Sequence, residues 1–187
     1  MISALVHPRL ALLSIILLAG CASGPSLFVN SDPSASFATY KTYDFAKPLD
    51  TDRDGYSSVL SQYLRTAASR ELEARGYQRS DNPDLLVNFH VATKEKVQTT
   101  TTQSAVPMRG YYGYRSGYYG VWSGYDTEVT QYTEGTLTMD IVDPARKQLV
   151  WEGTAVGRVR DKDRANLQPV VDKVISQLFS KYSYRAP

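Results

Sequence analysis

A short apolar segment near the N-terminus, residues 10–20, most constrains what this chain can fold into. It is apolar apart from Ser14. As a helix it reaches about 16 Å, whereas the hydrocarbon core of a bilayer needs about 30 Å. A stretch of this length behind a weakly basic lead that carries Arg9 is typical of a secretory signal peptide rather than a transmembrane helix. We therefore expect residues 1–20 to be removed and the fold to be built from the remainder.

The apolar segment ends in Leu18-Ala19-Gly20-Cys21, and Cys21 is the only cysteine in the chain. Small residues before the cleaved bond let an extended chain enter a peptidase cleft, and the thiol behind them can accept a diacylglycerol thioether. These four residues resemble the lipobox of bacterial lipoproteins. The resemblance implies that Cys21 begins the mature chain and carries acyl chains, of which two or more anchor a protein stably. The alternative is an ordinary secretory signal that happens to be followed by cysteine.

The residues after Cys21 bear on the choice of membrane. In enterobacterial lipoproteins, an aspartate next to the acylated cysteine retains the protein in the inner membrane. Here that position is Ala22, followed by Ser23. The resemblance therefore implies a lipid-anchored protein of the outer membrane that faces the periplasm, with the membrane itself as its first partner.

Composition limits the kinds of partner and site. The chain has 187 residues, 42% of them hydrophobic, which is room for one domain behind a signal. A net charge of +2 gives no basic footprint, so we expect no nucleic-acid partner. Two histidines and one cysteine exclude most zinc sites and any disulfide within the chain.

The spacing of apolar residues predicts an α+β fold of order β-α-β-β-β-α. Residues 21–37 are rich in Ser, Pro and Gly and are expected to form a flexible tether, and residues 38–187 a single α/β domain. Alternation predicts strands, and three- or four-residue spacing predicts helices over 56–75 and 167–182. We expect a two-layer sandwich in which a four-stranded mixed sheet, with one parallel crossover and a meander, carries both helices on one face.

A segment rich in Tyr and Gly, residues 109–126, interrupts the strands. Six of the 14 tyrosines lie between positions 110 and 125, and so many glycines favour neither helix nor core strand. We therefore predict a long loop. Flat aromatic rings stack on sugars, peptides or lipid headgroups, and the candidate ligand-binding residues are Tyr111, Tyr112, Tyr118, Tyr119 and Trp122. The alternative is a mobile loop whose rings pack loosely on the open face of the sheet.

An acidic stretch matches the first half of a calcium loop. Asp50, Asp52 and Asp54 occupy positions 1, 3 and 5, and Gly55 the sharp turn. Position 12, where calcium loops carry a bidentate glutamate, is Ser61. The alternative is a polar turn whose carboxylates cap the next helix. We expect no cofactor besides the covalent lipid on Cys21.

Catalysis has little support in the residues that remain after the signal. His90 is then the only histidine, and it is predicted to lie mid-strand on the polar face. Asp140 and Glu152 lie on neighbouring predicted strands and could meet as a carboxylate pair, but on an open face. A Gly-x-Ser-x-Gly turn is absent from the sequence. We expect no enzyme, with a weak hydrolase as a minor alternative.

Several stretches of the mature chain resemble one family of bacterial lipoproteins, domain of unknown function 4136 (DUF4136). They are the extended stretch at 32–45, the helix end at 72–77, the strand at 83–89, the aromatic-glycine loop and the hairpin from Gly135 to Gly153. The resemblance implies an envelope lipoprotein with a small α/β domain and supplies no catalytic or binding residue.

These observations together predict an outer-membrane-anchored envelope lipoprotein with a non-catalytic structural or binding domain. Its partner would be another envelope protein or peptidoglycan. The alternative is a module that binds glycan or peptidoglycan through the Tyr/Gly-rich segment. A calcium-dependent module is a less favoured reading.

Overall fold

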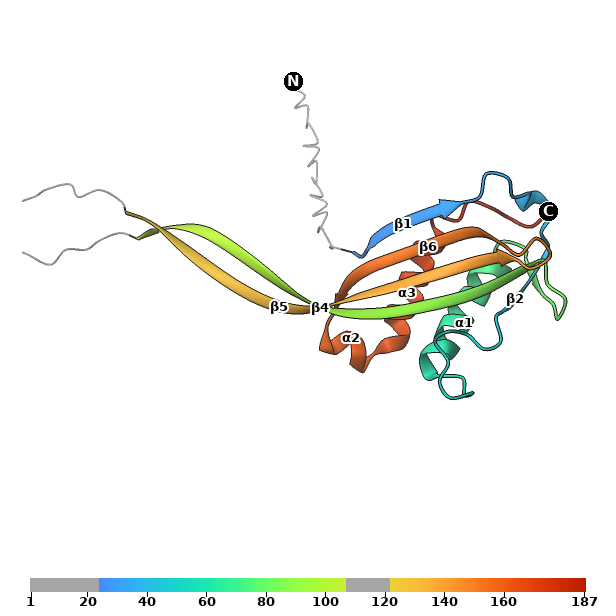
Figure 1. Cartoon of the computed structure of the whole chain (residues 1–187), viewed down its shortest axis with the longest axis horizontal. Helices are drawn as coiled ribbons and strands as arrows, with labels where there is room; N and C mark the ends of the chain where they lie inside the picture. Colours follow the sequence, from blue (N-terminus) through green and yellow to red (C-terminus); the bar gives the residue numbers. More distant parts are fainter. Residues whose placement is uncertain (1–23, 107–121) are drawn as a thin grey trace, which may run out of the picture.

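The computed structural model describes residues 24–106 and 122–187. It contains one sheet with helices against one face and a two-stranded extension at one end (Figure 1). In chain order the elements are β1 (Ser26–Ser31), the 3-10 helix η1 (Phe37–Thr39), β2 (Thr42–Phe45), α1 (Val59–Glu73), β3 (Gln78–Arg79), β4 (Leu85–Val106), β5 (Trp122–Asp143), β6 (Gln148–Val159), α2 (Asp161–Ala165) and α3 (Leu167–Phe179).

The order of strands across the sheet is β1-β6-β5-β4-β2-β3. β2 and β4 are parallel with α1 between them in the chain, which confirms the predicted crossover. β4, β5 and β6 form the predicted antiparallel meander. The α+β class is therefore confirmed.

The predicted count of elements was wrong, because the sheet has six strands rather than four and α2 is a third helix. The two extra strands lie at the edges. β3 is only two residues long, and β1 pairs antiparallel with β6 from Ser26↔Val156 to Ser31↔Trp151. β1 carries a weak apolar pattern because most of its side chains are exposed on both faces.

The prediction of a flexible tether over residues 21–37 is corrected by this pairing. β1 begins at Ser26, and the ring of Phe37 is buried and stacks on Tyr184 with 3.5 Å between centroids. The part of the predicted tether that precedes β1 is therefore residues 21–25, of which 21–23 lie outside the described residues.

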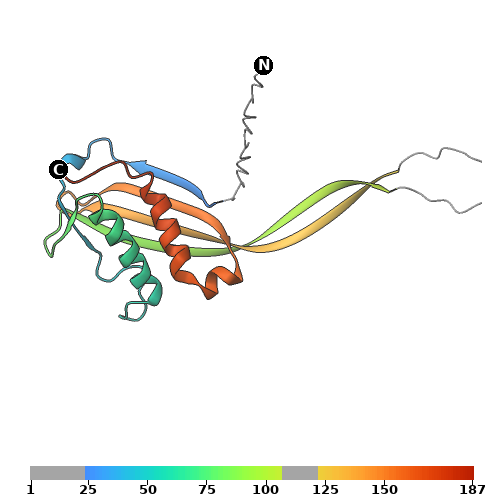
Figure 2. The ribbon, with the colours of Figure 1, turned by 180° about the vertical axis from the view of Figure 1, so that it is seen from behind.

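Both long helices cover the same face of the sheet (Figure 2). α1 begins where the Ser58 hydroxyl accepts a hydrogen bond from the amide of Ser61 (3.0 Å). It ends before Gly76, whose φ of 90° is the left-handed conformation that glycine commonly adopts just after a helix. α3 contributes the apolar stripe of Val171, Ile175, Leu178 and Phe179 to the core. No helix among the described residues is long and apolar enough to cross a membrane.

The core lies between these helices and the sheet. Alternate residues of the central strands are fully buried, among them Val87, Phe89, Met139 and Ile141, as a strand with one covered face requires. On β6 the indole of Trp151 lies over Gly153, where an added Cβ would collide with the ring. The glycine is therefore required for the aromatic packing.

β4 and β5 continue together beyond the rest of the sheet. Each has 22 residues, and the last pair between β5 and β6 is Thr133↔Val159. Residues 122–132 of β5 therefore pair only with residues 96–106 of β4. We call these two segments the arm, and the remaining described residues the body. At about 3.3 Å per residue the arm is about 35 Å long, and it leaves the body as a twisted ribbon (Figure 1).

The arm corrects the predicted loop over residues 109–126. Residues 122–126 belong to β5 and pair with β4 from Val106↔Trp122 to Thr102↔Asp126. Residues 109–121 lie outside the described part of the chain.

Candidate functional site

The face of the sheet opposite the helices carries polar side chains, as the alternation predicted. Three strands contribute to two adjacent rows. One row is Asn88, Asp140 and Glu152, and the other is His90, Thr138 and Thr154. The two threonine hydroxyls are 3.1 Å apart. Neighbouring strands thus bring Asp140 and Glu152 directly opposite each other, as expected.

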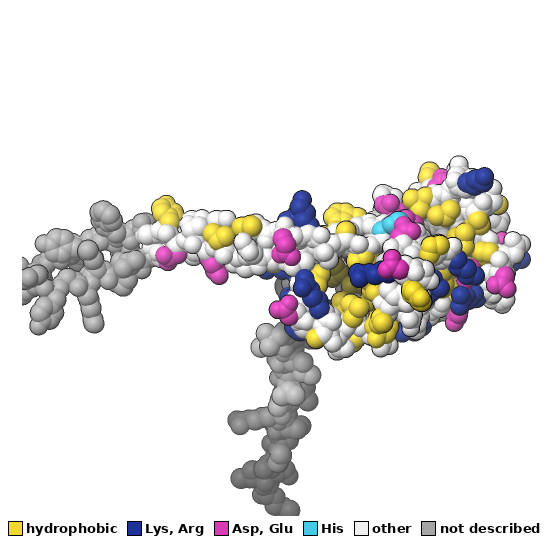
Figure 3. Space-filling view, turned by 60° about the horizontal axis from the view of Figure 1, so that its bottom comes forward, with side chains coloured by type: hydrophobic (Ala, Val, Ile, Leu, Met, Phe, Trp, Pro, Cys, Tyr) yellow, Lys and Arg dark blue, Asp and Glu magenta, His cyan; other side chains and the backbone are white. Residues whose placement is uncertain are grey.

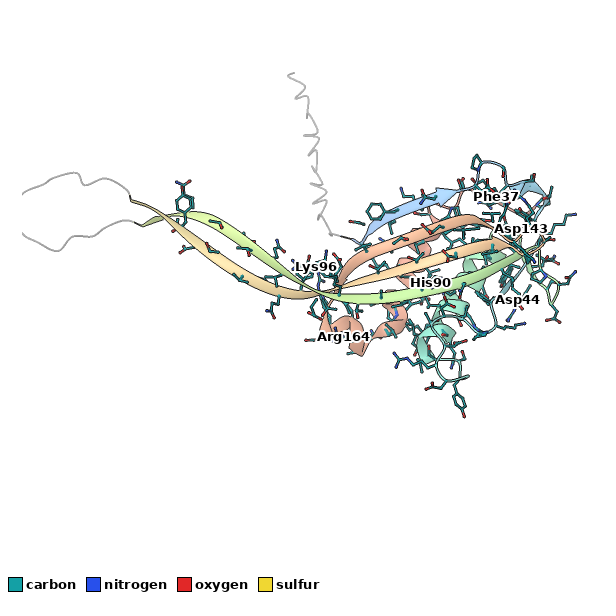
Figure 4. All side chains as sticks on the ribbon, in the orientation of Figure 1. Phe37, Asp44, His90, Lys96, Asp143 and Arg164 are labelled. Atoms are coloured by element: carbon teal, nitrogen blue, oxygen red, sulfur yellow. The ribbon has the colours of Figure 1, made fainter. Side chains whose placement is uncertain are left out.

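His90 lies between two carboxylates on this face, in the part of β4 that belongs to the body (Figure 4). Its Nδ1 is 2.7 Å from Oδ2 of Asp50, and its Nε2 is 3.0 Å from Oδ2 of Asp140. Asp50 belongs to the segment that follows β2, and its amide donates to Oδ1 of Asn88 at 3.2 Å. Only a protonated ring donates from both nitrogens. In a neutral ring one of the two carboxylates loses its hydrogen bond.

The surroundings of Asp140 raise the pKa of its carboxyl group. Burial raises its pKa, and the carboxylates of Glu152 and Asp50 act in the same direction, which together outweigh the opposing effect of His90. Its second oxygen, Oδ1, is buried and accepts no hydrogen bond from the described residues. A carboxylate in this setting binds a proton more readily than an exposed one does.

The cluster of Asp50, His90 and Asp140 holds the segment after β2 against the open face. Both ring nitrogens of His90 are engaged by carboxylates, so neither is directed at a hydroxyl or thiol among the contacts that the structure describes. The side chain is nearly half exposed. The cluster can hold a proton and cross-link two segments, and we derive no catalytic step from it.

The three carboxylates of the predicted calcium loop do not converge. Asp50 pairs with His90. Asp52 accepts from the amide of Leu49 at 3.0 Å and lies 3.2 Å from the Arg65 guanidinium. Its pKa is lowered by the Ser61 hydroxyl and by Arg65. Among the described residues, 24–106 and 122–187, no group of three or more His, Cys, Asp or Glu side chains is placed to hold a metal ion. The cap of the next helix is Ser58 rather than one of these acids.

Most of the other candidate residues lie outside the described part of the chain. These are Cys21, Tyr111, Tyr112, Tyr118 and Tyr119. Trp122 is the first residue of β5, and its side chain is likewise not described.

The root of the arm is held by a group of side chains from β4, β5, β6 and α2. Arg158 lies 4.0 Å from the centre of the Tyr132 ring and donates to Gln98. Lys96 and Glu134 form an ion pair at 3.2 Å. From α2, Arg164 donates to the Thr133 hydroxyl at 3.1 Å. Figure 4 places Lys96 and Arg164 where the arm leaves the body.

Beyond this root the arm lacks a core. Val97, Val129 and Tyr125 are 61–70% exposed. No side-chain hydrogen bond or ion pair is found among the described side chains of residues 99–104 and 124–131. Figure 3 shows this part as mostly uncharged polar surface with a few acidic and hydrophobic side chains. The arm is therefore a solvated ribbon held by its strand pairing.

Sequence reasoning missed both the arm and the partner of His90. The threonine-rich run after position 94 was a signal for a longer strand, but its partner across residues 107–121 was not evident. The contact of Asp50 with His90 joins residues 40 positions apart, and it depends on the parallel pairing of β2 with β4.

Comparisons with known proteins agree with this fold. A family model described as "Domain of unknown function (DUF4136)" matches residues 28–183. No curated protein sequence matches the chain. A PDZ domain protein from Parabacteroides distasonis has a TM-score of 0.54 at 14% identity, over 88% of this chain and 38% of that chain. This chain thus spans well under half of that protein's length.

Two further solved structures have lower scores. A PelC dodecamer structure from Paraburkholderia phytofirmans has a TM-score of 0.45 at 14% identity, over 83% of this chain and 95% of that chain. A putative neuraminyllactose-binding hemagglutinin homolog from Helicobacter pylori has a TM-score of 0.40 at 15% identity, over 78% and 84%. At such identities the likenesses concern the fold alone.

Proposed function

This chain belongs to the DUF4136 family, and from this premise we propose that it is a lipid-anchored lipoprotein of the outer membrane. Its non-catalytic domain faces the periplasm and binds another envelope component by way of the arm. The observation that carries the proposal is the arm itself. A ribbon of about 35 Å without a core of its own adds little to folding, so we assign it to reaching a partner.

The short connection to the anchor supports this division of roles. Once β1 is included in the body, only four residues, 22–25, separate the acylated Cys21 from Ser26 at the start of the sheet. Such a segment spans at most about 18 Å. The body is then held close to the membrane surface, and the arm supplies the reach that the tether lacks.

The anchor is tested by replacing Cys21. In cells fed labelled palmitate, the parent chain incorporates label and fractionates with membranes, whereas Cys21→Ser incorporates none and is released as a soluble protein. Ala22→Asp tests the destination, with Ala22→Ser as its matched control. In an enterobacterial host we expect only the aspartate variant to move to the inner membrane. Label that persists in Cys21→Ser would contradict the anchor.

A second candidate function is the binding of glycan or peptidoglycan. The observation that favours it is the place of residues 107–121, which connect the outer ends of β4 and β5 in the chain. In the chain, the tyrosines of this segment therefore come after Val106, the last residue of β4, and before Trp122, the first residue of β5.

Cosedimentation with purified sacculi tests this second candidate. The parent chain is expected in the pellet, and a variant with Ser at Tyr111, Tyr112, Tyr118 and Tyr119 in the supernatant. Tyr125→Ser, a change on the exposed side of the arm, is the control and should still pellet. If the two variants pellet equally, the four tyrosines do not bind peptidoglycan.

A further inference from the structure

The free edges of the sheet differ in how they are protected against pairing with another strand. Edge strands expose unpaired backbone N–H and C=O groups, and proteins protect them with short length, proline or charge. β3 has two residues and includes Arg79. β1 has six, with Pro25 and Pro33 on its two sides. Both outer strands of the body thus carry the usual protection.

The free edge of β4 is protected only along its first part. β2 pairs with β4 up to Val87, and Asp50 then contacts Asn88 and His90. Charged side chains follow from Lys94 to Lys96. From position 97 to 106 the sequence VQTTTTQSAV contains no charge and no proline. This is a long, uncharged and β-prone strand with one edge open.

The other free edge of the arm, which belongs to β5, differs from the β4 edge because it carries charged residues. β5 carries Asp126 and Glu128 within the arm, and the structure describes no basic side chain opposite them, since their partners on β4 are Thr102 and Thr100. Two strands without a hydrophobic face are at best marginally stable in water. The arm is therefore expected to gain a further strand, and the uncharged edge of β4 is the place for it.

We propose that the arms of two copies of this chain pair through β4, antiparallel and related by a two-fold axis at Thr100 or Thr101. An isologous contact must be self-complementary, and this edge is. With the axis at Thr100, that residue lies opposite the partner's Thr100, and Thr99 lies opposite the partner's Thr101. Val97 lies opposite the partner's Gln103. Threonine pairs stabilise neighbouring strands.

Because four threonines follow one another on β4, the two copies can pair in more than one register. An axis at Thr101 in place of Thr100 again places threonine opposite threonine at the three central positions. The same operation on the β5 edge, with the axis at Thr127, would place Asp126 opposite the partner's Glu128. Like charges directly opposite each other destabilise a strand pair. Charge therefore favours the β4 edge and keeps the acidic strands on the outside of a four-stranded arm.

Cysteine cross-linking in intact cells tests the contact. Across an antiparallel pair, opposite Cα atoms are about 4.5–5.5 Å apart, which is within disulfide range. We expect Thr100→Cys or Thr101→Cys to give a covalent dimer under mild oxidation, roughly tenfold more than the control. The control is Thr127→Cys, which lies on the other strand opposite Thr101 in the register. The parent chain, with Cys21 alone, measures the background.

Three outcomes would overturn the proposal. Thr127→Cys could form as much dimer as the β4 variants, or neither β4 variant could exceed the parent, or the adduct could have the mass of a different protein. Sedimentation of the purified full chain gives an independent measurement. Thr100→Lys combined with Thr101→Lys should weaken self-association roughly tenfold or more, because an axis at either position then places two lysines directly opposite each other, whereas Thr127→Lys should leave it unchanged.

Discussion

β4 and β5 run through both the body and the arm, and the difference between the two regions shows what a strand needs in order to stay paired. In the body, Phe89 of β4 and Met139 of β5 are fully buried under the helices. In the arm, Val97 and Val129 continue the same face and are more than 60% exposed. Backbone pairing is continuous through both regions, so the hydrogen-bonded ladder does not by itself require a core. Side-chain burial, in contrast, ends with the helices.

The body and the arm should therefore differ in local stability although they share strands. Hydrophobic burial contributes about 25 cal/mol per Å², and a two-stranded ribbon is marginal alone. We expect the largest effects of substitution in the body and small ones in the arm.

The largest effect is expected at Phe89, whose ring is buried and lies 6.2 Å from that of Phe45. Phe89→Ala should lower the free energy of unfolding by about 3–5 kcal/mol because it leaves a cavity in the core. Tyr125→Ala, the aromatic truncation in the arm, should change it by less than about 0.5 kcal/mol. Urea denaturation followed by circular dichroism measures both. Similar losses for the two variants would contradict a division into body and arm.

A matched pair of valines on β4 makes the comparison sharper. Val87 is fully buried and Val97 is 63% exposed, and both face the same side of the sheet. Val87→Ala should cost about 2 kcal/mol from the two lost methyl groups and the cavity. Val97→Ala should cost less than about 0.5 kcal/mol. If Val97→Ala costs as much as Val87→Ala, the arm must be covered by something that contributes to the stability of the whole chain.

Two aspartates lie on the open face of the body, and replacing each by asparagine should change the free energy of unfolding at pH 7 in opposite directions. For Asp44, burial opposes ionisation, but Lys47 (2.6 Å), the Phe45 amide and Arg79 (2.9 Å) outweigh it and lower the pKa. A lowered pKa stabilises the fold above the unfolded value near 3.8, and this contribution is lost as the pH falls through the folded pKa. Asp44→Asn should therefore cost about 1–2 kcal/mol at pH 7 and less at pH 3, where the unfolded carboxyl is mostly protonated.

Asp140 should behave in the reverse way, because its pKa is raised by burial and by Glu152 and Asp50. Ionisation of this carboxyl then costs folding free energy, and the cost is absent below about pH 3.8 and develops as the pH rises through the folded pKa. Asp140→Asn should gain up to about 1 kcal/mol at pH 7 and nothing at pH 3. Urea denaturation of both variants at the two pH values checks the signs. A stability loss at pH 7 for both would show that the contact with His90 dominates.

A local effect is expected where the two regions join. Arg158→Ala removes the cation–π contact with Tyr132, which at an exposed site contributes about 0.5–1 kcal/mol. Hydrogen exchange of amides near the root of the arm should then be about two- to fivefold faster, with unchanged exchange at Val87 and Phe89. Arg53→Ala, in the segment before α1, is the control. Faster exchange throughout the body would show that the root contributes to global stability.

Sequence patterns correctly predicted the elements whose apolar residues recur at the spacing of a buried face. The buried stripe of α3 and the alternation of Leu85, Val87 and Phe89 both follow from local rules, and the structure confirms each. β1 was not predicted because only Leu27 of its residues is partly buried against the core. A strand so exposed leaves little apolar pattern to detect.

Local residue patterns were enough to specify the α+β class, the helices, the strands that have a buried face, and the family resemblance. The assembled sheet was needed to show which residues complete its edges, that Asp50 and Asp140 share His90, and how far β4 and β5 run past the helices. The reason is physical: helices and covered strands are selected by periodic burial, which is written along the chain. Edge pairing, charge contacts and a ribbon without a core depend on which distant segment lies alongside, and that is known only when the sheet is assembled.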